Sequence, residues 1–98
     1  MTWRVVFRRA AQAEFIDAAA WYEQRREGLG EEFVREIELA IGKAADSPAS
    51  YPVVSADVRR TVIRRFPYCI YFRMRQGRLV VLAVFHGRRD PKVWQRRV

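Results

Sequence analysis

The chain has 98 residues, half of them hydrophobic, which predicts a single domain over residues 1–98 with a modest core. One cysteine and one histidine exclude an internal disulfide and argue against a zinc site, so we expect no metal and no cofactor. The net charge of +8 leads us to expect an anionic partner. No run approaches the roughly 18 apolar residues of a membrane span and no signal peptide is evident, so we expect a cytoplasmic protein without membrane contact.

The first half of the chain predicts a strand, two helices and a loop. Residues 3–7, Trp-Arg-Val-Val-Phe, are typical of a short strand. Apolar residues at helical spacing predict helices over about residues 9–26 and 31–45, joined by a tight turn at Gly28 and Gly30. So short a link predicts an antiparallel helical hairpin. Pro48 stops the second helix, and residues 46–57 are expected to form a loop.

The second half predicts three strands, over residues 58–65, 68–75 and 79–86, with a hairpin turn at residues 76–78. The last strand is apolar on both faces, so we expect it to lie centrally in the sheet. Asp90-Pro91 is typical of a helix start and predicts a short C-terminal helix. The order β-α-α-β-β-β(-α) indicates an α+β fold, in which the helical hairpin packs on one face of an antiparallel sheet.

Positive charge is concentrated in residues 51–98, which carry twelve Lys and Arg against two acids, whereas residues 1–50 carry seven against nine. Eleven of the twelve are Arg, whose planar fork of donors fits phosphate and carboxylate groups. Alternation over residues 68–75 places Cys69, Tyr71, Arg73 and Arg75 on the face of the sheet away from the helices. This polar, basic and aromatic face is the predicted functional surface.

Several short segments follow one another in an order that is typical of one protein family. They are Ala-Ala-Ala-Trp-Tyr-Glu (18–23), Gly-Leu-Gly-Glu-Glu-Phe (28–33), Ser-Pro-Ala-Ser-Tyr-Pro (47–52), Phe-Pro-Tyr (66–68) and Val-Phe-His-Gly-Arg-Arg-Asp-Pro (84–91), with Arg59, Ile70, Tyr71 and Trp94. In these segments the chain resembles, over essentially its whole length, the RelE/ParE toxins of bacterial type II toxin–antitoxin systems, and particularly the ParE or plasmid-stabilisation branch.

The resemblance implies a compact α+β toxin that a cognate antitoxin, ParD-like or RelB-like, holds inactive. Such an antitoxin wraps an acidic, amphipathic segment around the toxin, and operator DNA would be contacted only through it. ParE-like members are described as poisoning DNA gyrase, whereas RelE-like members cleave mRNA on the ribosome without a metal. We expect a ParE-like toxin that inhibits growth by binding gyrase, with a ribosome-dependent mRNA endoribonuclease as the alternative.

The resemblance to the nucleases is incomplete at the positions that would do chemistry. Many RelE-like nucleases carry Arg directly after the tyrosine that begins the middle strand, where this chain has Cys69. Their lysines on the preceding strand correspond to Arg60 and Val62. His86, Arg88 or Arg89, and Trp94 lie roughly where those enzymes have a basic residue, an arginine and a tyrosine. If the chain is a nuclease, the catalytic candidates are therefore His86, Arg60, Arg88 and Arg89.

For a toxin that works by binding, the candidate contacts with the target lie on the basic sheet face and in the C-terminal segment. They are Tyr71, Arg73, Arg75, Arg88, Arg89, Trp94, Arg96 and Arg97. Structural roles compete with three of the catalytic and target-binding assignments. His86 can hydrogen-bond the turn at residues 87–90, Trp94 can pack the terminal helix onto the domain, and the cluster Arg88, Arg89, Arg96 and Arg97 can be a solvated edge. Arg59 is expected to anchor the preceding loop or to pair with a helix acid such as Glu23.

Overall fold

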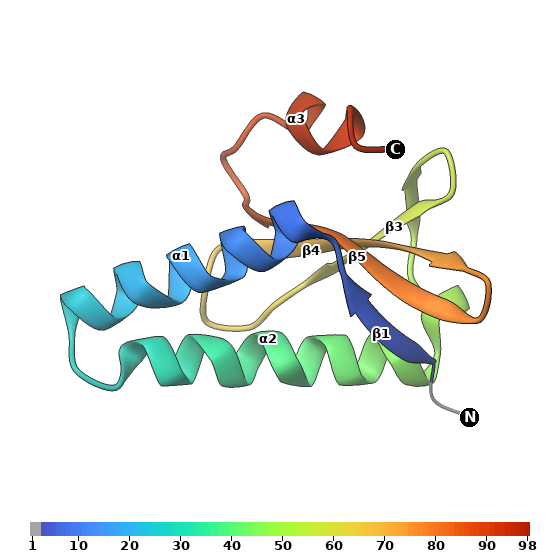
Figure 1. Cartoon of the computed structure of the whole chain (residues 1–98). Coiled ribbons are helices and arrows are strands. Elements are labelled where there is room, and N and C mark those ends of the chain that lie inside the picture. Colours follow the sequence, from blue (N-terminus) through green and yellow to red (C-terminus); the bar gives the residue numbers. More distant parts are fainter. Residues whose placement is uncertain (1–2) are drawn as a thin grey trace.

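The structure, a computed structural model, describes residues 3–98 and contains a helical hairpin, a five-stranded sheet and a short terminal helix (Figure 1). In chain order the elements are β1 (Arg4–Phe7), α1 (Arg9–Arg25), α2 (Leu29–Asp46), a 3-10 turn (Pro48–Ser50), β2 (Val53–Ser55), β3 (Val58–Val62), β4 (Tyr68–Arg75), β5 (Arg78–His86) and α3 (Lys92–Gln95). The predicted α+β class is confirmed, and so is the predicted order of elements except for the additional strand β2. None of the helices in the described residues is long and apolar enough to cross a membrane.

The strands are ordered β1-β5-β4-β3-β2, so the predicted interior position of β5 is confirmed. The β3-β4-β5 meander is antiparallel as expected, but β1 joins the edge of β5 in parallel, which makes the sheet mixed. A parallel neighbour is possible because the helical hairpin carries the chain across the sheet before the meander begins. The segment 46–57 is less irregular than expected, since it contains β2, which pairs with β3.

The turn between α1 and α2 is closed by one carboxylate. The backbone N–H groups of Gly28 and Gly30 each donate to the Glu23 side chain at 2.9 Å, so an acid late in α1 satisfies donors at the start of α2. Gly28 has a φ of 87°, a conformation that glycine adopts without steric cost. Arg59 holds the next connection, because its Nη1 donates to the carbonyls of Tyr51 at 2.6 Å and Ala49 at 3.2 Å. Its expected role as loop anchor is confirmed.

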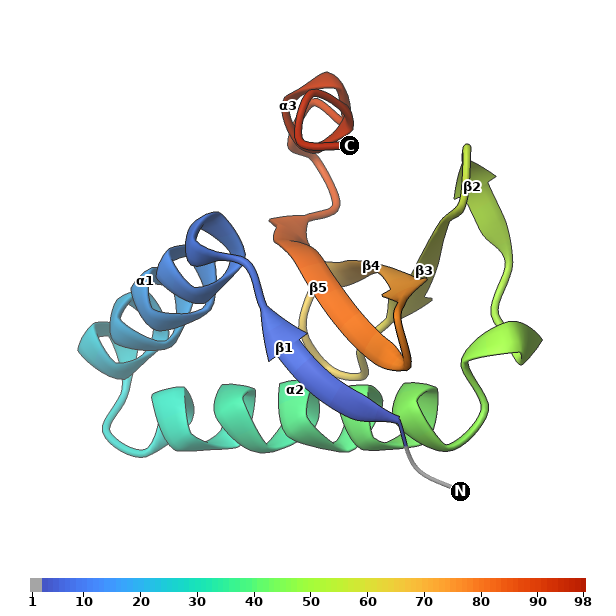
Figure 2. The same ribbon diagram turned by 45° about the vertical axis from the view of Figure 1, so that its right-hand side comes forward.

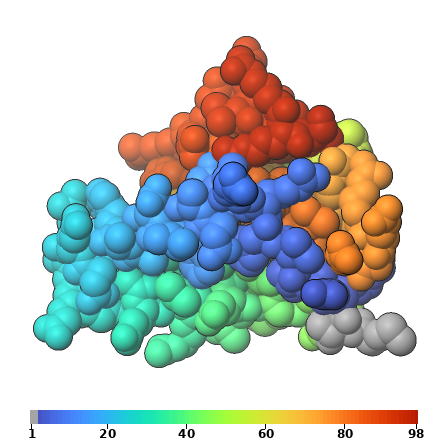
Figure 3. Space-filling model, in the orientation of Figure 1, coloured from blue at the N-terminus to red at the C-terminus, as the bar shows by residue number. Residues whose placement is uncertain are grey.

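The sheet is covered on both faces. The main core lies between the helical hairpin and the sheet, and includes Phe33, Ile37, Ile70 and Phe72, all with 0% exposure. A second core lies on the other face under α3, which stands apart from the hairpin in Figure 2 and forms a ridge above α1 in Figure 3. It contains Val58, Val80, Leu82, Ala83, Phe85 and Trp94.

This second core corrects the expectation that the face away from the helices is open and polar. A register shift between Tyr71 and Phe72 pairs these residues with Ala83 and Val81, which leaves Leu82 as an extra residue in β5. Leu82 and Ala83 therefore both belong to the second core, and strict alternation along β5 is lost. The bulge increases the apolar area on this face, which α3 then covers.

Gly30 marks the closest approach of the two long helices. A Cβ at this position would lie 2.6 Å from the backbone oxygen of Ala19, whereas a Cβ at Gly42, on the same helix, would meet nothing within 4 Å. We predict that Gly30→Ala lowers the free energy of unfolding by about 1–3 kcal/mol, because backbone must move to admit the methyl group. Gly42→Ala should raise it by up to about 1 kcal/mol, since alanine is the better helix former.

Urea denaturation followed by circular dichroism measures both substitutions. Equal effects of the two alanines on the midpoint would contradict a close contact between α1 and α2 at Gly30.

Candidate functional site

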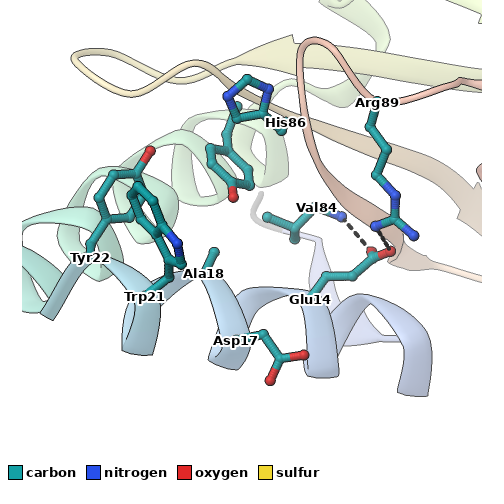
Figure 4. A pocket seen from close by; sticks show the side chains of 9 residues that line it. Glu14, Asp17, Ala18, Trp21, Tyr22, Val84, His86 and Arg89 are labelled. Carbon is teal, nitrogen blue, oxygen red and sulfur yellow. Dashed lines mark hydrogen bonds and ion pairs between the residues drawn. The ribbon is translucent and has the colours of Figure 1, made fainter. Parts of the chain in front are cut away.

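The Glu14 carboxylate on α1 is the centre of the contacts that hold the C-terminal segment. Its Oε1 accepts from the backbone N–H of Val84 at 3.1 Å and from Arg97 Nη1 at 3.1 Å. Its Oε2 accepts from Arg89 Nη1 at 2.9 Å and Arg97 Nη2 at 2.8 Å. Arg97 also donates to the carbonyl of Leu82 at 2.9 Å. Figure 4 shows Glu14 between Val84 and Arg89. Two of the predicted target-binding arginines, Arg89 and Arg97, are thus paired inside the chain.

The sequence analysis did not select Glu14, although a signal was present. Glu14 lies three residues after Ala11 and four before Ala18, within the apolar stripe of α1 that faces the sheet. An acid inside such a stripe needs a partner when it is buried. Its side chain is 13% exposed, and the partners come from the opposite end of the chain.

Trp94 is enclosed by the domain. Its ring is 2% exposed and stacks on Tyr71, with the ring centroids 4.4 Å apart and an angle of 22° between the planes. The helix start that presents it is capped as expected from Asp90, whose Oδ1 accepts from the backbone N–H of Lys92 at 2.9 Å. Trp94 and Tyr71 therefore pack α3 onto the sheet, which is the structural role weighed against target contact.

Arg73 and Arg75 lie on the expected side of β4, but a single acid engages both. Arg73 is only 7% exposed and binds Asp57 with two hydrogen bonds, at 2.7 Å and 3.3 Å. Arg75 Nη2 lies 3.3 Å from the second oxygen of Asp57. These contacts tie the turn between β2 and β3 to β4. They also hold the pKa of the Asp57 carboxyl below its usual value, chiefly through the hydrogen bond from Arg73.

His86 is fixed by the turn that follows it. Its Nδ1 accepts the backbone N–H of Arg88 at 3.1 Å, and its ring meets Tyr68 edge-on with centroids 5.4 Å apart. Because Nδ1 is an acceptor in this contact, the proton of the neutral imidazole resides on Nε2. The structural role expected for His86, a hydrogen bond within the 87–90 turn, is thus present.

One part of the second sheet face remains open. It is the β3–β4 patch, which we define as Arg60, Val62 and Cys69. Val62 is 64% exposed and pairs with Cys69 across the strands, while Arg60 is exposed and pairs with Tyr71. Burial raises the pKa of the Cys69 thiol, and the neighbouring Arg60 lowers it by less, so the thiol stays protonated near neutral pH. The patch is basic and apolar, and it carries no group suited to proton transfer at neutral pH.

The remaining predicted contacts, Arg88 and Arg96, are exposed near the C-terminus and are not engaged through their side chains within residues 3–98. The structure therefore divides the predicted site residues into two sets. Buried or paired are Tyr71, Arg73, Arg75, His86, Arg89, Trp94 and Arg97, and open are Arg60, Arg88 and Arg96. The described residues contain no group of His, Cys, Asp and Glu side chains arranged to hold a metal ion.

A pocket of about 390 Å³ opens beside this network, between α1 and the ends of β4 and β5. Its lining includes the candidate residues His86 and Arg89, together with Asp17, Trp21 and Tyr22 on α1, which the sequence analysis did not select (Figure 4). The sequence did contain a signal for Asp17 and Trp21, namely a tryptophan one turn after an acid on a helix that is otherwise rich in alanine.

The helical hairpin on a mixed sheet, with a short helix over the second face, defines a small α+β domain. The family model described as "ParE toxin of type II toxin-antitoxin system, parDE" matches residues 5–91, so the chain belongs to the ParE toxin family. A solved structure with a similar fold is a chain of the "Chromosomal ParDE TA system from P. aeruginosa", with a TM-score of 0.73 and 17% sequence identity over 87% of this chain and 96% of that one. A comparison with curated protein sequences finds no match.

We predict that Glu14→Ala destabilises the fold by about 2 kcal/mol, because the N–H of Val84 and the partly buried Arg97 both lose their partner. Chemical denaturation measures the loss. The matched control is Gln12→Ala, an exposed site two residues earlier on α1, where the change should stay within about 0.5 kcal/mol. A loss no larger than that of the control would show that the network does not support the fold.

The depressed pKa of Asp57 predicts an acid-dependent part of the stability. An ordinary Asp has a pKa of about 4 in the unfolded chain, so the stabilisation is fully present above that pH and is lost as the pH falls through the lower folded-state pKa. Asp57→Asn should therefore flatten the dependence of the unfolding free energy on pH below about pH 4. Superimposable pH profiles for the two proteins would contradict the pairing with Arg73.

Proposed function

We propose that this chain inhibits growth by binding DNA gyrase, and that a cognate antitoxin of the ParD type neutralises it. Membership of the ParE toxin family supports the toxin role, and the similarity to a chain of a ParDE system supports an antitoxin partner. The observation that carries a binding mechanism is the β3–β4 patch, in which an exposed valine and a protonated thiol lie beside one arginine.

A metal-independent ribonuclease needs a group that removes the proton of the 2′-hydroxyl, one that protonates the leaving oxygen, and cations for the phosphate. At the positions that resemble those of the nucleases, this chain has a neutral thiol at Cys69 and an enclosed tryptophan at Trp94. Arg89 is engaged with Glu14. These substitutions and contacts favour recognition of a protein surface over cleavage of RNA.

The antitoxin proposal also follows from charge. Residues 51–98 carry ten more positive than negative side chains, and the predicted site arginines that remain open, Arg60, Arg88 and Arg96, can bind carboxylates. An acidic, amphipathic antitoxin segment would complement both these arginines and the exposed side chain of Val62. Contact with operator DNA would then be made by the antitoxin.

A ribosome-dependent mRNA endoribonuclease is the second candidate. The observation that favours it is the pocket in which His86 lies with Tyr68 and Arg89, since a histidine, a phenol and a guanidinium can together move a proton and bind a phosphate. In this case Nε2 of His86 would be the acid or base.

Brief expression of the chain in bacteria separates the two candidates. The gyrase proposal predicts SOS induction, filamentation and trapped gyrase–DNA complexes, with full toxicity retained by His86→Ala. Rapid loss of translation with codon-biased cuts in mRNA, abolished by His86→Ala, would instead establish the ribonuclease.

The β3–β4 patch is tested by Val62→Asp, which places a charge where an apolar contact is proposed. We expect gyrase trapping to fall at least about tenfold, the cost of losing one central interface contact. The matched control is Val53→Asp on β2, where the valine is also half-exposed but pairs with Arg59 outside the patch. Equal trapping by the two folded variants would contradict a role for the patch.

A further inference from the structure

The pocket between α1 and the ends of β4 and β5 is separate from the β3–β4 patch and has no part in the gyrase proposal. Its size, about 390 Å³, falls in the range of small-ligand sites. Figure 4 shows Trp21 and Tyr22 on one side, His86 above, and Asp17 below. The pocket is open to solvent, and its ligand chemistry can be inferred from its walls.

Four of the nine residues that line the pocket have aromatic rings, and these rings contact one another. Trp21 meets Tyr22 edge-on, with centroids 5.1 Å apart and planes at 89°, and Tyr22 meets Tyr68 at 6.2 Å and 65°. Tyr68 in turn meets His86 at 74°. In each of these pairs the edge of one ring covers a face of the other, so the contact itself leaves the remaining ring faces uncovered, and an uncovered face attracts a cation.

Trp21 already binds a cation from within the chain. The guanidinium carbon of Arg25 lies 4.2 Å from the centroid of the Trp21 ring, although both side chains are exposed. Trp21 itself is 51% exposed, so part of its surface remains accessible. This internal pair shows that the electrostatics around Trp21 accept a guanidinium even in a chain of net charge +8.

The polar groups that line the pocket provide more acceptors than free donors. Asp17, one turn before Trp21, makes no hydrogen bond or ion pair within residues 3–98, and neither do the hydroxyl groups of Tyr22 and Tyr68. Burial raises the pKa of both phenols, so they remain neutral hydroxyls that accept as well as donate. A carboxylate and two hydroxyl groups beside aromatic rings suit the N–H donors of a guanidinium or ammonium group.

An anionic ligand fits the same walls poorly. The one guanidinium in the lining, that of Arg89, is bound to Glu14 and lies 4.1 Å from the ring centroid of Phe85. A phosphate or carboxylate would have to displace Glu14 from Arg89, and would also meet the unpaired Asp17 carboxylate. Charge therefore favours a cation in this pocket, in contrast to the basic surface elsewhere in the second half of the chain.

We propose that this pocket binds an arginine or lysine side chain of a partner polypeptide. The cation lies against the faces of Trp21 and Tyr68, and Asp17 supplies the counter-charge. The site does not depend on the gyrase proposal, and it competes with the ribonuclease alternative, which would place a phosphate in the same pocket.

Titration of the purified full-length chain with N-acetyl-arginine amide, followed by NMR, tests the proposal. We expect saturable shifts of the Trp21 indole and His86 ring signals, with dissociation constants in the millimolar range. N-acetyl-citrulline amide, which has nearly the same shape without the charge, should bind at least about fivefold more weakly, because a cation over an exposed ring contributes on the order of that ratio.

Substitutions of the lining residues test whether the arginine amide binds in this pocket. Asp17→Asn and Trp21→Ala should each weaken arginine-amide binding by about fivefold while circular dichroism stays unchanged, since both side chains are exposed. The matched control is Glu27→Gln in the exposed turn between α1 and α2, which should leave the affinity unaltered. Equal binding of the citrulline compound, tighter binding of adenosine monophosphate, or no saturable binding would each overturn the proposal.

Discussion

The Glu14 carboxylate is the contact on which the arrangement of this molecule depends. β1 pairs only with Arg78–Val81, so the outer edge of β5 continues beyond its neighbour. An unpaired edge of this kind exposes backbone donors and acceptors. Here side chains complete it: Glu14 accepts from Val84 N–H, and Arg97 donates to the carbonyl of Leu82. One acid on the first helix thus takes the place of the missing strand and, through Arg97, holds the last residues of the chain against the sheet.

This contact decides which positive charges remain available to a partner. The C-terminal segment carries Trp94 over the bulged, apolar face of β5, where it stacks on Tyr71. Arg89 and Arg97 are used to hold it there. Part of the positive charge in the second half of the chain therefore stabilises the fold. The surface that remains open to a partner has fewer free arginines, and is more apolar, than the arginine count suggests. A surface that combines Arg60 with a 64% exposed Val62 suits a protein partner better than a bare phosphate chain.

Regular periodicity explains where sequence reasoning succeeded. β4 was predicted with its observed bounds, and α1 and α2 to within one or two residues at each end, because their apolar residues recur at the spacing of one structural type. The alternation of side chains along β4 also placed Arg73 on the correct face of the sheet, the one away from the helical hairpin. Its burial was missed because the partner, Asp57, lies in a turn 16 residues earlier, and no local pattern reports such a pair. The bulge at Leu82 was missed for the same reason, since it depends on how β5 pairs with β4. The structural roles weighed for His86, a hydrogen bond to the turn that follows it, and for Trp94, packing of the terminal helix onto the domain, were anticipated, whereas the role of Glu14 required the fold.

Native-state hydrogen exchange tests most directly whether the C-terminal segment is an integral part of the fold. In this account the Val84 amide and the Trp94 indole exchange only when the whole domain unfolds, so their opening free energies should match that of core amides such as Ile70. Exchange of both groups at a much lower free energy than Ile70 would contradict it. The segment would then be a loosely attached cover, and Trp94, Arg89 and Arg97 would be available to a target after all.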